Sequence, residues 1–95
     1  EMLTACETAL PADVAVCAAA VADWRAESEA TQKLKKDGGG PPTFRLAENP
    51  DILATLAGRN ADRPRLVVGF AAETENVIAH ATAKRARKGC DWIVA

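Results

Sequence analysis

The stretch that decides the fold is LVVGFAAETENVIAHATAKRARKGCDWIV, residues 66–94. Its two ends, residues 66–70 and 91–94, are short apolar runs of the kind that form strands buried on both faces. Between them, apolar residues recur at helical spacing, Thr74 is a candidate N-cap, and Gly89 is placed to end the helix. A strand, a helix and a second strand in this order predict a parallel βαβ unit.

The segments before this unit extend the same alternation. Residues 2–10 carry apolar side chains at helical spacing, and residues 14–21 form an apolar run that begins as a strand buried on both faces. Residues 22–42 are predicted to be irregular, because they end in a Gly-Gly-Gly-Pro-Pro run that neither a helix nor a central strand tolerates. Residues 43–46 then predict a short alternating strand.

A second helix is predicted just after that strand. Asn49 is its expected N-cap, Pro50 takes the first helical position, and Asp51 suits the positive end of the helix dipole. Gly58 is expected to end this helix. Apolar strands that alternate with helices predict an α/β domain with a mostly parallel sheet. The 95 residues suffice for one domain, and we expect part of a domain that is truncated at both ends.

The composition argues against several classes of protein. Acidic and basic side chains nearly balance at a net charge of −1, unlike nucleic-acid-binding domains that neutralise phosphates. The sequence has no run near the roughly 18 apolar residues that cross a bilayer, so no membrane partner is expected. The three cysteines are odd in number and form no Cys-x-x-Cys pair, which favours a reduced, cytoplasmic protein.

The loop after the first strand is a candidate binding site, because ligands of parallel sheets bind beyond the carboxyl ends of the strands. Ala18, Ala19 and Ala20 have small side chains that let the backbone approach a flat ligand closely. Asp23 then offers a carboxylate to a ribose hydroxyl, a base edge or a metal ion. The alternative is a strand end packed against a neighbour, with Asp23 capping a turn.

Two further segments carry groups that suit a nucleotide. Lys33, Lys35 and Lys36 provide point charges for phosphate, although an isolated basic run is more commonly a solvated surface. Phe70 ends the second strand and either stacks on a base or belongs to the core. His80 has no partner at metal-ligand spacing, so no metal site is expected, and no glycine-rich phosphate motif is present in the sequence.

Five blocks of the sequence stand out when they are taken in order. They are AAVADWR (19–25), QKLKK (32–36), NPDIL (49–53), VGFAAET (68–74) and KGCDWIVA (88–95). Together they resemble the phosphopantothenate–cysteine ligase family, and most closely its bifunctional bacterial type, in which the ligase follows a flavin-dependent decarboxylase. The resemblance implies a Rossmann-like three-layer α/β domain with a mostly parallel sheet, of which this chain is a fragment.

The resemblance also implies an activity. In this family the carboxylate of 4′-phosphopantothenate attacks the α-phosphate of CTP to give an acyl-cytidylate and pyrophosphate, and the amine of L-cysteine then displaces CMP. The implied cofactor is Mg²⁺, with FMN only if a decarboxylase domain lies outside this sequence. The implied assembly is a homodimer in contact through a flap, residues 31–46. The alternative from another class is a nucleotide-binding or dimerisation module without catalysis.

The resemblance further implies which residues form the site, with Lys33 as the catalytic lysine of the flap. The residues implied to contact CTP are Ala18, Ala19, Ala20, Asp23, Lys33, Asn49, Pro50, Asp51, Ile52, Phe70, Lys84 and Lys88. Lys84 and Lys88 are expected roughly 15–20 Å from the start of their helix. A helix that returns across the sheet carries them away from the strand ends, unless it is arranged differently. Other family segments are expected before Glu1, so we expect this stretch alone to be inactive.

Overall fold

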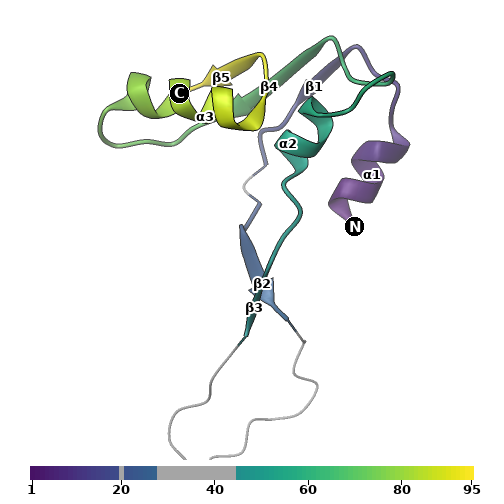
Figure 1. Cartoon of the computed structure of the whole chain (residues 1–95), viewed down its shortest axis with the longest axis horizontal. Helices are drawn as coiled ribbons and strands as arrows, with labels where there is room; N and C mark the ends of the chain where they lie inside the picture. Colours follow the sequence, from purple (N-terminus) through teal and green to yellow (C-terminus); the bar gives the residue numbers. More distant parts are fainter. Residues whose placement is uncertain (20, 28–44) are drawn as a thin grey trace, which may run out of the picture.

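The computed structural model describes residues 1–19, 21–27 and 45–95, and its elements follow an α/β order (Figure 1). In chain order they are α1 (Met2–Thr8), β1 (Val14–Val16), β2 (Trp24–Ala26), β3 (Leu46–Glu48), α2 (Ile52–Ala57), β4 (Leu66–Phe70), α3 (Val77–Lys88) and β5 (Trp92–Val94). The helix predicted within residues 2–10 is confirmed as α1. None of the helices in the described ranges is both long and apolar enough to cross a membrane.

A parallel sheet of β1, β4 and β5 forms the centre of the fold, with β4 in the middle. Val16 pairs with Val68 on one side of β4, and Gly69 pairs with Ile93 on the other. This arrangement confirms the predicted α/β fold class with a mostly parallel sheet. Because the three strands run in the same direction, their carboxyl ends lie at the same edge of the sheet.

β2 and β3 form a separate antiparallel arm, the β2–β3 arm, that leads away from the sheet (Figure 1). Trp24 lies opposite Glu48, and Ala26 lies opposite Leu46. The prediction that residues 22–42 are irregular is therefore wrong at β2, and the strand predicted at 43–46 is described only from Leu46 onward. All three residues of β2 are exposed, so their extended form depends on pairing with a partner far along the chain rather than on burial.

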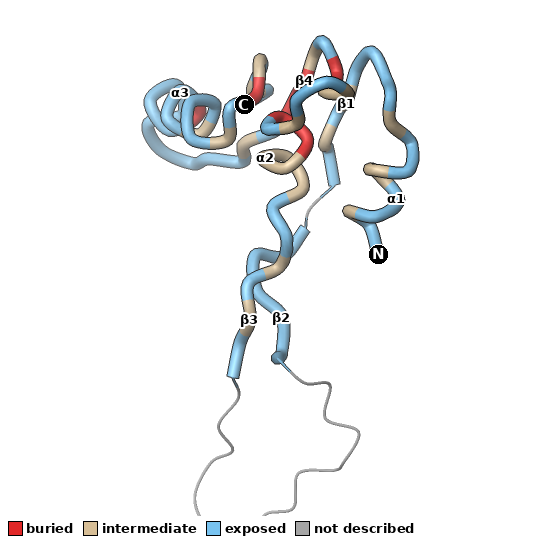
Figure 2. Tube along the Cα trace, turned by 45° about the vertical axis from the view of Figure 1, so that its right-hand side comes forward, coloured by how far each residue is buried: buried red, intermediate tan, exposed pale blue. Residues whose placement is uncertain are grey.

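α2 and α3 both lie on the face of the sheet that carries Ile93. The core consists of Ala57, Val67 and Cys90, with Leu53 and Ile93 packed against it. Figure 2 shows the buried positions gathered around β4 and the end of α2. Gly69 brings α2 close to β4, because a Cβ at this position would lie 2.5 Å from Cδ2 of Leu53.

The other face of the sheet is exposed in the part of the chain that the structure describes. Val14 and Val16 of β1 are 52% and 58% exposed, and Trp92 of β5 is 60% exposed. The prediction that β1 and β5 are buried on both faces is therefore wrong. They are edge strands with described helices on one side only, whereas central β4 keeps Val67 and Val68 buried.

The start of α2 differs from its prediction. Its N-cap is Asp51 rather than Asn49, because Oδ1 of Asp51 accepts a hydrogen bond from the N–H of Ala54 at 3.0 Å. Pro50 therefore precedes the cap instead of opening the helix. The end of α2 is confirmed at Gly58.

The start of α3 also differs from its prediction. Its N-cap position is Asn76 in the left-handed conformation (φ 47°), not Thr74, so residues 71–76 form a loop before the helix begins. Asparagine adopts this conformation more readily than most residues. The end of α3 is confirmed at Gly89, whose φ of 73° is a left-handed value that favours glycine.

Asn49 fastens the base of the β2–β3 arm. Its Nδ2 donates to the carbonyl of Ala22 at 2.7 Å, and its backbone N–H donates to the carbonyl of Asp23 at 2.8 Å. Nη1 of Arg25 donates to Oδ1 of Asn49 at 3.2 Å and to the carbonyl of Glu48 at 2.6 Å. These bonds occupy the Asn49 amide, which explains why the helix cap falls two residues later.

Asp91 joins β4 to the loop before β5. Its Oδ2 accepts hydrogen bonds from the N–H of Val67 at 2.9 Å and from Nη2 of Arg63 at 3.2 Å. The bond from Val67 is the main cause that holds the pKa of Asp91 below its ordinary value of 3.8. Partial burial opposes this shift, and the Arg63 hydrogen bond and the positive charges of Arg63 and Arg85 reinforce it.

We predict that Asp91→Ala lowers the free energy of unfolding by about 1–3 kcal/mol, because the N–H of fully buried Val67 loses its acceptor. The pKa of Asp91 is lower in the folded chain than in the unfolded one. Its carboxylate therefore stabilises the fold above about pH 4, and this contribution is lost as the pH falls through the lowered pKa. Urea unfolding of the full-length protein at neutral and acidic pH measures both effects. The control is Asp13→Ala, an exposed position, and an equal loss there contradicts the prediction.

We predict that Asn49→Ala loosens the β2–β3 arm without unfolding the sheet. The loss of one or two hydrogen bonds is expected to speed amide exchange in β2 and β3 by about 2- to 10-fold. Hydrogen–deuterium exchange on the full-length protein measures this change, with Asn60→Ala in the exposed turn before β4 as the control. Unchanged exchange in β2 and β3 would show that the arm does not depend on the Asn49 side chain.

Candidate functional site

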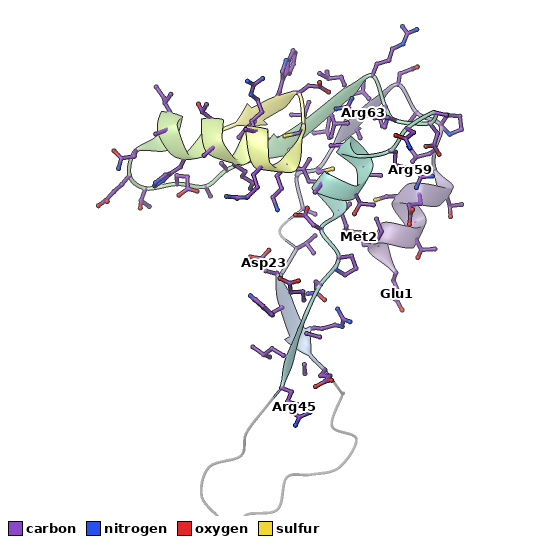
Figure 3. The ribbon with its side chains drawn as sticks, in the orientation of Figure 1. Glu1, Met2, Asp23, Arg45, Arg59 and Arg63 are labelled. Carbon is purple, nitrogen blue, oxygen red and sulfur yellow. The ribbon has the colours of Figure 1, made fainter. Side chains whose placement is uncertain are left out.

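An open cleft of about 1320 Å³ lies beyond the carboxyl ends of β1 and β4. The residues that line it are 16–19, 21–25, 48–53 and 70–72, together with Met2, Cys6, Lys84 and Lys88. Figure 3 shows Asp23 where the chain leaves the sheet and enters the β2–β3 arm. The cleft therefore lies at the edge where parallel sheets bind their ligands.

The cleft gathers the described residues that the sequence nominated for nucleotide binding. The nominated residues that line it are Ala18, Ala19, Asp23, Asn49, Pro50, Asp51, Ile52, Phe70, Lys84 and Lys88. The other two, Ala20 and Lys33, lie outside the described residues, as does most of the 31–46 flap. Segments that are far apart in the sequence thus meet around one hollow.

Lys84 reaches the carboxyl end of β4, so the alternative of a differently arranged helix holds. Its Nζ donates to the carbonyl of Phe70 at 2.5 Å. This arrangement arises because α3 begins only at Val77, after the loop of residues 71–76. Lys84 therefore lies in the middle of the helix, and the helix returns alongside the strand ends.

Lys88 lies one helical turn beyond Lys84 and contacts Asp51 across the cleft. Its Nζ forms an ion pair with Oδ2 of Asp51, whose Oδ1 caps α2. Partial burial acts to raise the pKa of Asp51, but the hydrogen bonds from Lys88 and Ala54 and the charges of Lys88 and Arg87 hold it below its ordinary value. Asp51 is therefore ionised at neutral pH.

Asp23 and Phe70 are accessible from the cleft. Among the described residues, none donates a hydrogen bond to the Asp23 carboxylate, so the alternative that it caps a turn has no support here. Phe70 is 39% exposed, which excludes a fully buried core position. Both side chains are free to meet a ligand within the described part of the cleft.

Charges in the described lining of the cleft balance. The carboxylates are Asp23, Glu48 and Asp51, and the cations are Arg25, Lys84 and Lys88. Arg25 lies in the block AAVADWR but was not predicted as a site residue, because only its hydrogen bond to Asn49 in the folded chain places it at the cleft. No group of three described His, Cys, Asp or Glu side chains is arranged to hold a metal.

The titratable groups that often act as nucleophiles or bases have other roles here. Cys17 lines the cleft, but burial, reinforced by the neighbouring cysteines, raises the pKa of its thiol, so the thiol stays protonated. Cys90 belongs to the core. His80 is exposed on α3, with its Nδ1 3.4 Å from Oε2 of Glu73.

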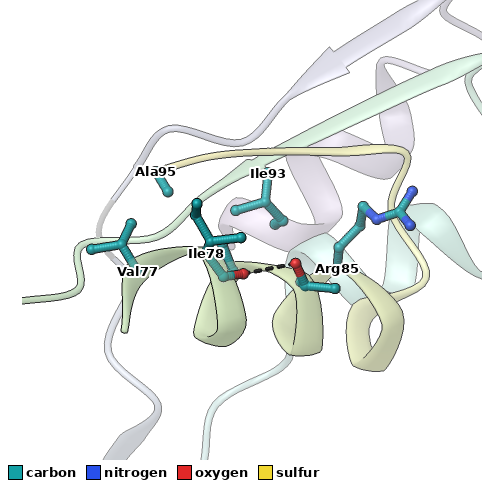
Figure 4. Close-up of a pocket in the computed structure, with 7 residues that line it drawn as sticks. Val77, Ile78, Arg85, Ile93 and Ala95 are labelled. Carbon is teal, nitrogen blue, oxygen red and sulfur yellow. Dashed lines mark hydrogen bonds between the residues drawn. The ribbon is translucent and has the colours of Figure 1, made fainter. Parts of the chain in front are cut away.

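A second, smaller hollow of about 320 Å³ lies between α3 and β5 (Figure 4). Val77, Ile78, Ile93 and Ala95 give it an apolar lining, and Arg85 borders it. The polar groups of the large cleft do not reach it. The large cleft is therefore the better candidate for the functional site.

Comparison with known proteins finds close relatives over most of the chain. It is 50% identical over 91 residues to the coenzyme A biosynthesis bifunctional protein CoaBC of Mycobacterium tuberculosis, covering 87% of this chain and 22% of that protein. It is 49% identical over 79 residues to the protein of the same name from Escherichia coli, covering 81% of this chain and 19% of that one. The protein of that name from Vibrio parahaemolyticus is 43% identical over 88 residues, covering 92% and 22% of the two chains.

The chain thus spans about a fifth of the length of the curated relatives that it matches. A family model also matches residues 1–95, which is the whole of the chain. That family is described as the C-terminal domain of DNA/pantothenate metabolism flavoproteins. The chain therefore belongs to the family of DNA/pantothenate metabolism flavoprotein C-terminal domains.

Proposed function

We propose that this chain forms part of the CTP site of a phosphopantothenate–cysteine ligase that works in coenzyme A biosynthesis. The observation that carries the proposal is the gathering of the nominated residues around one cleft at the carboxyl ends of β1 and β4. Relatives at about 50% identity that are named coenzyme A biosynthesis bifunctional proteins support the pathway. The reaction itself follows from the resemblance of the five sequence blocks to the ligase family.

The proposed reaction has two steps. First, a carboxylate oxygen of 4′-phosphopantothenate attacks the α-phosphorus of CTP, forming an acyl-cytidylate and releasing pyrophosphate. Second, the amine of L-cysteine attacks the acyl carbon, forming the amide and releasing CMP and a proton. Both steps depend on positioning and on the neutralisation of phosphate charge, rather than on a nucleophile of the protein.

The residues of the cleft suit these tasks. The small side chains of Ala18 and Ala19 let the backbone approach the nucleotide, and the half-exposed ring of Phe70 is available to stack on a base. Lys84 and Lys88 supply positive charge for phosphate oxygens. Asp23 offers an acceptor to a ribose hydroxyl or to the amino group of cytosine.

Other parts of the proposal concern components outside the described residues. Lys33 is proposed as the flap lysine that neutralises charge in the transition state, and Mg²⁺ is proposed to enter together with the nucleotide. The full-length protein is proposed to be a cytoplasmic homodimer that is in contact through the flap. A flavin-dependent decarboxylase is proposed as a further domain of the same protein, consistent with the word bifunctional in the relatives' name.

We predict that Lys33→Gln reduces CTP-dependent release of CMP by about 10²- to 10³-fold, because one preorganised charge is lost from the transition state. The assay uses the full-length protein with 4′-phosphopantothenate and L-cysteine. Lys35→Gln is the matched control in the same basic run and is expected to have a much smaller effect. An unchanged rate in Lys33→Gln would refute the assignment, and CTP binding without any turnover by the wild type would favour a non-catalytic binding module.

We predict that Asp23→Asn weakens CTP binding by about 10-fold or more, because a charged acceptor in the cleft is lost. Isothermal titration calorimetry of the full-length protein with CTP measures the change. Asp13→Asn is the matched control, since Asp13 precedes β1 at the opposite edge of the sheet. If the two variants bind CTP equally well, Asp23 has no part in nucleotide recognition.

A further inference from the structure

One carboxylate in the cleft serves two partners at once. Oδ1 of Asp51 accepts the N–H of Ala54 at 3.0 Å and caps α2, while its Oδ2 pairs with Nζ of Lys88. The carbonyl of Asp51 also accepts the Thr55 hydroxyl at 2.6 Å and the Thr55 N–H at 2.9 Å. The position of Asp51 is thus fixed by α2 and does not depend on Lys88.

The two lysines of α3 have different partners, although they lie on one face of the helix four residues apart. Nζ of Lys84 donates to the neutral carbonyl of Phe70, so its charge remains available to an anion. Nζ of Lys88 pairs with the Asp51 carboxylate, so its charge is neutralised. The side chain of Lys88 is 20% exposed and that of Asp51 is 43% exposed, so the pair remains open to water on the Asp51 side.

The balance of charge in the cleft makes this difference matter. Among the described lining residues, three carboxylates face three cations. A polyphosphate that enters such a cleft finds the charge of Lys84 available, whereas the charge of Lys88 becomes available only if Lys88 exchanges its carboxylate partner for a phosphate oxygen. Lys88 is the cation with a carboxylate partner and a flexible side chain, so it is the natural candidate for this exchange.

We propose that Asp51 competes with the phosphates of the nucleotide for Lys88. When a polyphosphate binds, Nζ of Lys88 leaves Oδ2 of Asp51 and donates to a phosphate oxygen, while Oδ1 of Asp51 remains on the N–H of Ala54. Asp51 is therefore a positioning residue that holds Lys88 at the cleft and lowers the affinity for the polyphosphate. This inference rests on the proposed function, because it assigns a polyphosphate to the same cleft.

The test uses Asp51→Asn in the full-length protein. Asparagine caps helices as well as aspartate does, so the variant keeps the bond to Ala54 and removes only the charge that holds Lys88. Isothermal titration at low salt, with CTP and separately with inorganic tripolyphosphate, is expected to show binding that is roughly 2- to 5-fold tighter than in the wild type. Unchanged or weaker binding of both ligands overturns the proposal.

Two controls separate partner exchange from a general change in charge. Glu48→Gln removes the same charge from the cleft, but its carboxylate has no described lysine partner, so a smaller gain is expected. In a Lys88→Gln background the effect of Asp51→Asn is expected to vanish, as a double-mutant cycle would show. An equal gain in Glu48→Gln, or a gain that persists without Lys88, overturns the proposal.

A further comparison keeps the test decisive if Asp51→Asn folds poorly. Because Lys88 must leave Asp51 to bind phosphate, Lys88→Gln is expected to cost less affinity than Lys84→Gln, and an equal or larger cost contradicts the exchange. If the wild type binds no CTP, the proposed function fails. The tripolyphosphate titrations still decide the role of Asp51 in that case, since tighter binding by Asp51→Asn supports the exchange and its absence refutes it.

Discussion

The parallel pairing of β4 with β1 and β5 is the constraint on which the rest of the structure depends. Hydrogen bonds continue each pairing beyond the strands, from the N–H of Cys17 to the carbonyl of Val68 at 2.8 Å and from the N–H of Ala71 to the carbonyl of Val94 at 2.9 Å. These bonds fix where the loops after β1 and β4 begin. The cleft exists because both loops start at the same edge of the sheet.

The central strand–helix–strand unit was readable from the sequence because each of its elements is specified locally. The apolar run of β4, the helical spacing of α3 and the left-handed Gly89 agree with one another, so the fold class followed directly. Which faces of the sheet are buried could not be predicted from the sequence, because the exposure of Val14 and Trp92 depends on the layers that surround the edge strands. β2 was missed because it is extended through its pairing with β3, a strand far along the chain.

The candidate site was likewise only partly predictable from the sequence. The resemblance of short blocks nominated residues without their geometry, and the fold brings the described ones to one cleft. The prediction that Asn49 caps α2 was wrong because its amide is hydrogen-bonded to the β2–β3 arm, which leaves Asp51 to cap the helix. The reach of Lys84 and Lys88 was left open by the sequence, because it depends on where α3 begins, and the left-handed Asn76 delays that start. Arg25 escaped notice because its contact with Asn49 joins strands that are distant in sequence.

Under the proposed function, the attraction of this cleft for a nucleotide depends in part on the rearrangement of charges already present. Its most direct test is a crystal structure of the full-length protein with CTP bound. The account predicts the triphosphate beside Lys84 and Lys88, with the nucleoside between the loop after β1 and Phe70. A nucleotide bound elsewhere on the protein, with this cleft unchanged, would contradict it.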